Sequence, residues 1–516
     1  MYRIDIRAEN RRYSSRFFVF GQDILHDDTN RDGLLEELNI LDIELDKMPP
    51  EENDKHETSG SAEKQQNDCS DVTASSVEAP YVSTENRDIA EGTNEVEHWN
   101  KPFANIGRLV FAFLSFIIAG MNDGAVGALI PYLEEYYNLS YTTVSLVFLT
   151  PFVGYSLAAF TNATIHMKWG QRGIAFIAPI CHIITYAVLA IHPPWPVLII
   201  INIFSGFGNG ACDACFCAWV GVMSKANTIQ GFMHACYSVG ALLAPMIATS
   251  FVVSGKLPWY TFYYVMVGLS VIEWVGLLVT FWHRTGAVHR MNHQGEFEKG
   301  GVGLRDALKS KVTWLCAAFF FAYMGAEVGI GGWVVTFMLR IRNASRYASG
   351  VSGTAFWAGM TVGRAGLGFV TERFGERLCI TVYLAFAITF QLLFWLVPDF
   401  IVSAVSVAFL GVFLGPLFPG AVMVTAKLLP QRIHVSAIGF AMAIGGTGGT
   451  IFPFIIGAIA SHAGVGVLQP IILALIALVT IIWLNFPHVS EDERVLLKMR
   501  RLIKAVLTKL KKQEPV

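Results

Sequence analysis

Three acidic residues, Asp123, Asp213 and Glu327, lie inside long apolar stretches of this chain. An ionised carboxylate at the centre of a membrane costs about 3 kcal/mol, so acids in such positions usually serve a function. A carboxyl group that is neutral in one state and ionised in another can carry a proton, and all three residues are candidates for this role. Each could instead be a neutral carboxyl group that hydrogen-bonds between helices for structure.

The composition indicates that these apolar stretches cross a membrane. Hydrophobic residues make up 53% of the 516 residues, and charged residues make up 15%. A soluble domain carries about 25% charged residues. The sequence has no soluble basic face that would bind nucleic acid. It also lacks a nucleotide-binding loop, an HExxH motif and a nucleophile elbow, so we do not expect an enzyme.

Apolar stretches of about 20 residues, the length that crosses a ~30 Å hydrocarbon core as a helix, recur from Arg108 onward. We therefore expect an all-α membrane protein with 12 transmembrane helices. They are predicted at residues 108–130, 143–165, 173–191, 196–221, 228–252, 260–282, 312–338, 347–371, 378–397, 400–425, 432–460 and 465–486.

The charges outside the spans are uneven. The first 100 residues contain 24 acidic and 10 basic residues, and their composition predicts disorder. After Pro487, an apolar stripe surrounded by Lys and Arg predicts either an amphipathic helix on the anionic inner leaflet or a solvated helix. The expected parts are a tail at 1–100, a six-helix half at 101–282, a central loop at 283–311, a second half at 312–486 and a basic tail at 487–516.

Lysine and arginine in the loops predict the orientation. With the N-terminus inside, the inner loops contain 13 of these residues and the outer loops contain four. The Asn-x-Ser sequons at Asn138 and Asn343 both fall in outer loops under this assignment, so both are candidate glycosylation sites. We expect both termini in the cytosol and a location in the plasma membrane.

The two halves repeat one another. A gapless shift of 205 residues places the first span on the seventh and aligns eight of the 13 glycines between residues 107 and 240 with glycines. Asn138 falls on Asn343, and Arg172 falls on Arg377. Six spans repeated in the same orientation are typical of transporters that bind their solute between two parallel halves. Small residues also let helices pack closely, but this does not explain the shared register.

This organisation resembles the major facilitator superfamily. Residues 368–377 are similar to the G-x-x-x-D-R-x-G-x-R loop of that family, with Glu372 in place of the aspartate. The copy in the first half keeps only the glycine and the arginine. The resemblance assigns a conformational role to both copies, through Gly368, Glu372, Arg373, Gly375, Arg377, Gly170 and Arg172.

Within that superfamily, the chain resembles the fungal form of the fucose:proton symporter branch. The similar segments are residues 121–123, 206–213 and 323–329. The resemblance places the first, fourth, seventh and tenth spans around a cavity and implies that Asp123 and Asp213 handle a proton, with Glu327 as a further candidate. It places the sixth span at the periphery, so we expect a packing role for Glu273. Arg364 is expected to pair with a buried acid or to tie its helix to its neighbours.

The resulting hypothesis is proton-coupled symport of a small polar solute, such as a sugar, by a monomer in the lipid bilayer. It needs no cofactor and no metal, because the proton gradient drives it. Amide and indole side chains inside the spans are candidates to bind the solute: Asn122, Asn162, Asn209, Trp333, Trp357 and Gln391. The alternatives are an exporter that works by proton antiport and a non-transporting sensor with the same fold.

Overall fold

The computed structural model describes residues 97–292, 302–430 and 433–487. The predictions for the acidic tail before residue 97 and for the basic helix after residue 487 lie outside these residues. The six spans of the first half consist of α4 (Ala104–Tyr137), α5, η2 and α6 (Tyr141–Val144, Ser145–Phe148, Thr150–Trp169), α7 (Gln171–Ala190), α8 (Trp195–Gly221), α9 and η3 (Ala226–Thr249, Ser250–Ser254), and α10 (Thr261–Thr280).

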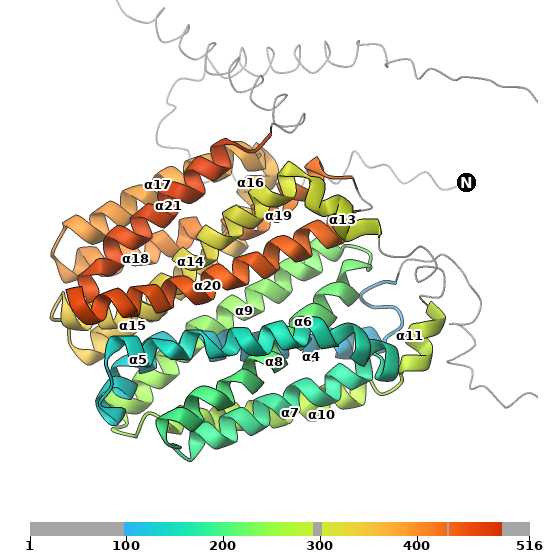
Figure 1. Ribbon diagram of the computed structural model, residues 1–516, viewed down its shortest axis with the longest axis horizontal. Helices are drawn as coiled ribbons and strands as arrows, with labels where there is room; N and C mark the ends of the chain where they lie inside the picture. Colours follow the sequence, from blue (N-terminus) through green and yellow to red (C-terminus); the bar gives the residue numbers. More distant parts are fainter. Residues whose placement is uncertain (1–96, 293–301, 431–432, 488–516) are drawn as a thin grey trace, which may run out of the picture. The chain divides into compact units, whose positions relative to one another are not determined.

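The second half repeats this order. It consists of α14 (Lys311–Arg340), α15, η4 and α16 (Arg346–Val362, Gly363–Leu367, Gly368–Phe374), α17 (Glu376–Leu396), α18 and α19 (Phe400–Leu414, Leu417–Leu428), α20 (His434–Ala463), and η6 and α21 (Val465–Val467, Leu468–Leu484). Two short helices, α11 (Gly286–Asn292) and α13 (Val302–Lys309), lie in the loop between the halves. Figure 1 shows the first half from blue to green and the second half from yellow to red.

Eleven of the described helices are long and apolar enough to cross a membrane. The remaining predicted span is the eighth, which runs from Arg346 to Phe374 through α15, η4 and α16. Its first helix has only 17 residues, because the π-helical segment η4 follows it. The fold is therefore the predicted one, with twelve spans in two parallel sets of six.

The repeat is visible in how the helices end. Gly170 ends α6 with φ 69°, and Gly375 ends α16 with φ 88°. These left-handed conformations favour glycine and reverse the chain into the next span. At the opposite end, Ser140 and Ser345 accept hydrogen bonds from the amides of Thr143 and Ala348, so each caps the helix that follows.

The two halves pack through α4 against α14, α9 against α15, and α20 against α5. Where α4 meets α14, a methyl group on Gly127 would lie 2.0 Å from the carbonyl oxygen of Gly331, so glycine is needed for this approach. We call the end of the spans that holds residues 138–140 and 341–345 the predicted outer end. The opposite end is the predicted cytosolic end.

Polar contacts join the halves at the predicted outer end. The guanidinium of Arg346 donates to Glu135 over 2.6 and 3.1 Å, and Arg340 lies 3.5 Å from Glu134. The Thr142 hydroxyl donates to the Ser461 hydroxyl oxygen over 2.8 Å. The structure is therefore closed between the halves at this end.

Candidate functional site

Asp123 lies on α4, facing α9, and neutral groups bind both of its oxygens. The amide of Asn122 donates to Oδ1 over 3.0 Å, and the hydroxyl of Tyr237 donates to Oδ2 over 2.7 Å. Among the ion pairs found between described residues, none includes Asp123. A tyrosine hydroxyl can both donate and accept, so Tyr237 can bind this carboxyl group in either protonation state.

Glycines place Tyr237 within reach of Asp123. A methyl group on Gly120 would lie 1.9 Å from the carbonyl oxygen of Tyr237, and one on Gly240 would lie 2.0 Å from that of Ile117. Larger residues at these positions would force α4 and α9 apart. The repeated glycines that predicted two similar halves therefore also set the geometry of the candidate site.

Glu327 has a different environment from Asp123. On α14, its Oε1 accepts a hydrogen bond from Nη2 of Arg364 over 2.8 Å, and both side chains are largely buried. Guanidinium groups only donate, so the glutamate oxygen is the acceptor of this charge-assisted hydrogen bond. Arg364 was expected either to pair with a buried acid or to tie its helix to its neighbours. In the structure it pairs with Glu327 and also contacts Ser238 of α9.

Arg364 also connects the two halves at mid-depth. Its Nη1 donates to the hydroxyl oxygen of Ser238 on α9 over 2.6 Å. The arginine lies in the π-helical segment η4, and such segments are frequent at functional sites because they turn a side chain out of the regular helical register. Ser238 directly follows Tyr237, so α9 contacts Asp123 and Arg364 through consecutive residues.

Asp213 lies on α8, where the thiol of Cys217, one helical turn away, is 3.3 Å from its Oδ1. The hydroxyl of Tyr155 on α6 interacts electrostatically with both Asp213 and Asp123. A methyl group on Gly210 would lie 2.8 Å from the Tyr155 ring, so the glycine makes room for that ring. Both aspartates therefore lie within electrostatic range of one tyrosine of the first half.

The predicted solute-binding residues lie in several environments. Asn122 is bound to Asp123 and is 8% exposed. Asn209 is buried, and neither of its amide atoms has a partner within the protein. Asn162 is half-buried on α6, and its Oδ1 also has no partner in the protein. These three amides come from the first half.

The other three predicted residues are buried in the second half. The indole of Trp333 donates to the carbonyl oxygen of Pro453 over 2.9 Å, and its ring lies 5.8 Å from Tyr141 of the first half. Trp357 lies against Gly331, where a methyl group would come within 2.6 Å of its ring. Gln391 is fully buried, and its Nε2 donates to Oε1 of Gln469 over 2.7 Å.

The two copies of the loop with the predicted conformational role, residues 368–377 and the first-half copy at Gly170 and Arg172, contact neighbouring helices in similar ways. Arg172 stacks over the ring of Trp282, which follows α10, at 5.2 Å. Arg377 donates to the carbonyl oxygens of Leu484 and Phe486 at the end of α21. Gly368, Glu372 and Arg373 are exposed at the predicted cytosolic end. Each arginine therefore ties the third span of its half to the sixth.

Asn138 and Asn343 are exposed, with φ of 53° and 52°. Both follow a long first span and precede the serine that caps the next helix. A structural role in this turn would also account for both Asn-x-Ser triplets. Their use as glycosylation sites remains a prediction.

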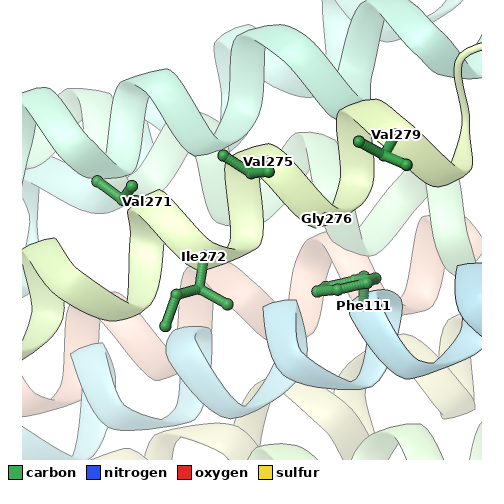
Figure 2. Close-up of a pocket in the computed structure, with 6 residues that line it drawn as sticks. All are labelled: Phe111, Val271, Ile272, Val275, Gly276 and Val279. Carbon is green, nitrogen blue, oxygen red and sulfur yellow. The ribbon is translucent and has the colours of Figure 1, made fainter.

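An apolar groove on the surface of α4 and α10 is a separate feature, with a volume of about 430 Å³. Figure 2 shows Phe111 of α4 beside Gly276, with valine and isoleucine side chains along α10. A methyl group on Gly276 would lie 2.0 Å from the Phe111 ring. Because its lining side chains are all apolar, this groove cannot orient a polar solute.

The residues that contact the acids and Arg364 were not predicted from the sequence. Tyr237, Ser238 and Tyr155 are ordinary-looking residues of apolar helices, and nothing in their spacing marks them. The pairing of His182 with Glu273, over 2.9 Å, was also missed. The useful signal was the glycine repeat, since a close approach of α4 and α9 makes the side chains beside those glycines neighbours.

The fold and the buried polar centre define a multi-pass membrane protein of the secondary-transporter class. The Major Facilitator Superfamily model matches residues 112–407 and 330–514. The chain belongs to this superfamily.

The chain matches most of the length of two relatives. The chain is 30% identical to "Bypass of stop codon protein 6" of Saccharomyces cerevisiae over 410 residues, which is 74% of this chain and 82% of that protein. It is 23% identical to the "Glucose/mannose transporter GlcP" of Bacillus subtilis over 359 residues, or 68% of this chain and 87% of that protein. The crystal structure of a D-xylose-proton symporter shares the fold, with a TM-score of 0.61, 14% identity, and coverage of 75% of this chain and 99% of that one.

Proposed function

We propose that this protein is a proton-coupled symporter for a small polar solute such as a sugar. The observation that carries the proposal is the contrast between two central acids. Asp123 is bound by neutral donors, whereas Glu327 is bound by the guanidinium of Arg364. Burial favours the uncharged form of an acid that has no cationic partner, so Asp123 is the better proton carrier.

The relatives support a sugar as the solute class. One is named as a glucose/mannose transporter, and a solved structure with the same fold is named as a D-xylose-proton symporter. Hydroxyl-rich solutes need buried hydrogen-bonding groups, and the unpartnered amide of Asn209 can provide both a donor and an acceptor. Asn122 would then bind the solute and the proton-carrying carboxyl group together.

We further propose that the protein lies in the plasma membrane with both termini in the cytosol. The positive charges of the loops support this orientation. In the structure the halves are then closed toward the outside, and alternating access requires the contacts of Arg346 and Ser461 to break when the outer end opens.

The experiment that tests this function is uptake of a panel of labelled sugars into proteoliposomes, with and without an imposed proton gradient. We expect at least one sugar to accumulate only when the gradient points in the direction of uptake. Accumulation under the reverse gradient would instead identify an antiporter. Binding without any transport would identify a sensor.

A further inference from the structure

A buried acid–base pair lies inside the first half, away from the junction of the two halves. Nδ1 of His182 on α7 is 2.9 Å from Oε2 of Glu273 on α10, and both side chains are fully buried. Each residue lies near the middle of a 20-residue helix. Groups that can carry charge are most costly at this depth, so the pair needs an explanation beyond the packing of α7 on α10.

The backbone of α8 is adapted to the imidazole. A methyl group on Gly208 would lie 2.5 Å from Nε2 of His182, so a larger residue there would displace the ring. The ring also stacks on Tyr186 with a centroid distance of 5.9 Å. The histidine is therefore held in place by three helices rather than filling a loose gap.

The pair belongs to a group of buried polar atoms that have no hydrogen-bond partner within the protein. They are Nε2 of His182, Oε1 of Glu273, the hydroxyls of Tyr186 and Ser270, and both amide atoms of Asn209. A buried polar group without a partner costs about 1–3 kcal/mol. Buried polar groups of this kind are usually satisfied by ordered water, which makes two to four hydrogen bonds.

Tyr186 connects the pair to the candidate site. Its hydroxyl lies within electrostatic range of both Glu273 and Asp123. Cys212 on α8 likewise interacts with both Glu273 and Asp213. The titratable groups that interact electrostatically with Glu273 are thus Tyr186 of α7 and Cys212 of α8. Tyr186 interacts in turn with Tyr263 of α10, Tyr155 of α6 and Asp123 of α4. Within the described residues, the ion pairs of this half include no Lys or Arg bound to Glu273.

The second half shows that packing alone does not require such a pair. Its corresponding helices, α17 and α21, hold the neutral amide pair Gln391–Gln469, with a distance of 2.7 Å between Nε2 and Oε1. That pair lies near the outer ends of its helices, whereas His182 and Glu273 lie at mid-helix. An amide pair therefore joins the third and sixth spans of the second half, and an imidazole–carboxyl pair joins those of the first half.

We propose that His182 and Glu273 form a second, internal proton-binding site that exchanges a proton with Asp123 through Tyr186 and ordered water. When the pair gives up a proton, its net charge changes from 0 to −1, and that of Asp123 changes from −1 to 0. The total charge of the first half is therefore conserved. The proton stays bound inside the protein instead of returning to the side of the membrane from which it came. The inference rests on the proposed proton coupling and adds a residue pair to it.

The test compares H182Q/E273Q with the wild type in proteoliposomes and in detergent. The double variant has the amide pair that the second half already uses, so we expect it to fold, bind the solute and catalyse exchange. We expect its gradient-driven accumulation to fall about tenfold, as is usual for coupled sites, and its dependence on pH to change. The matched control is T381V, which removes the hydrogen bond from Trp483 of α21 to Thr381 of α17 in the second half and should leave the pH profile unchanged.

A second measurement does not depend on transport. Solute-induced infrared difference spectra of the wild type should contain a carboxyl band that disappears in E273Q. In D123N, the carboxyl absorption of Glu273 should remain in the spectrum of the solute-free protein, but the solute-induced difference spectrum should lack the band. This readout also applies if the double variant fails to fold, because E273Q alone keeps a hydrogen bond to His182.

The results of these experiments distinguish the internal proton-binding site from the Asp123 carrier proposed above. Full accumulation and an unchanged pH profile in H182Q/E273Q, or a wild-type spectrum without a Glu273 band, would show that the pair only packs α7 on α10. Transport by the wild type that depends on sodium instead of pH, and loses this dependence in the double variant, would overturn a proton as the ligand. Normal accumulation by D123N with a solute-sensitive Glu273 band would contradict both the carrier proposed above and the proton exchange with Asp123. Loss of accumulation in D123N together with wild-type behaviour of H182Q/E273Q would overturn the internal site and leave the carrier standing.

Discussion

Tyr237 and Ser238, adjacent on α9, bind groups that belong to different halves of the protein. Tyr237 donates to Asp123 in the first half, and Ser238 accepts from Arg364 of the second half. Any movement of α9 relative to η4 must therefore change the contact of Arg364, and it can change that of Asp123 at the same time. If Asp123 carries the proton as proposed, this arrangement would link its protonation to the relative position of the halves.

Removal of Arg364 should destabilise the protein strongly. In R364M, Glu327 keeps its buried position but loses its cationic partner, and breaking a buried pair in this way costs about 3–5 kcal/mol. R364M/E327M removes both charges and should recover most of the loss. Thermal unfolding in detergent measures both effects. Equal destabilisation of the single and double variants would show that the pairing contributes little.

The spacing of α4 and α9 should be sensitive to a single methyl group. G240A places that group 2.0 Å from a backbone oxygen, so the helices must separate and the bond between Tyr237 and Asp123 must lengthen. We expect a loss of about 1–3 kcal/mol in stability and a larger loss of coupled transport. G439A is the matched control, since a methyl group there meets no atom within 4 Å. Similar behaviour of the two variants would contradict the proposed role of the glycine.

A disulfide should trap the state in which the two halves are closed at the predicted outer end. The side chains of Thr142 and Ser461 are 2.8 Å apart and come from opposite halves. In T142C/S461C, we expect an oxidant to form a disulfide that stops transport, and a reductant to restore it, because alternating access requires these residues to separate. T142C and S461C alone should remain insensitive to oxidation. Continued transport by the cross-linked protein would show that this end does not open.

The ion pair of Glu135 with Arg346 should affect conformation more than stability. Both side chains are over 40% exposed, and exposed pairs contribute little to folding. E135Q should nevertheless favour opening at the outer end, so a cysteine at residue 142 should react faster with a membrane-impermeant thiol reagent. The charge swap E135R/R346E should slow the reaction again. An unchanged rate in E135Q would mean that the pair does not hold the closed state.

The fold could be predicted because it depends on properties that short segments carry by themselves. Apolar length accounts for eleven of the twelve spans, and the glycine register showed that α4 corresponds to α14. The interruption at Gly363–Leu367 could not be predicted, because π-helical segments depend on the packing of neighbouring helices.

The acids of the site were also evident in the sequence, since charge is rare within apolar stretches. Their partners were not, because each partner is far away in the chain. Arg364 is 37 residues from Glu327, Tyr237 is 114 from Asp123, and His182 is 91 from Glu273. Helix packing alone decides which of these side chains meet, and that packing is not encoded in local periodicity.

The central claim is that Asp123 carries the coupled proton, and the most direct test measures accumulation and exchange of the same sugar in D123N proteoliposomes. The amide keeps the shape of the side chain and can still accept from Tyr237, but it cannot release a proton. We predict that D123N loses gradient-driven accumulation and keeps exchange between equal sugar concentrations, and that D213N shows the same pattern if the second aspartate shares the role. Accumulation by D123N against the sugar gradient with a normal pH dependence would contradict the account.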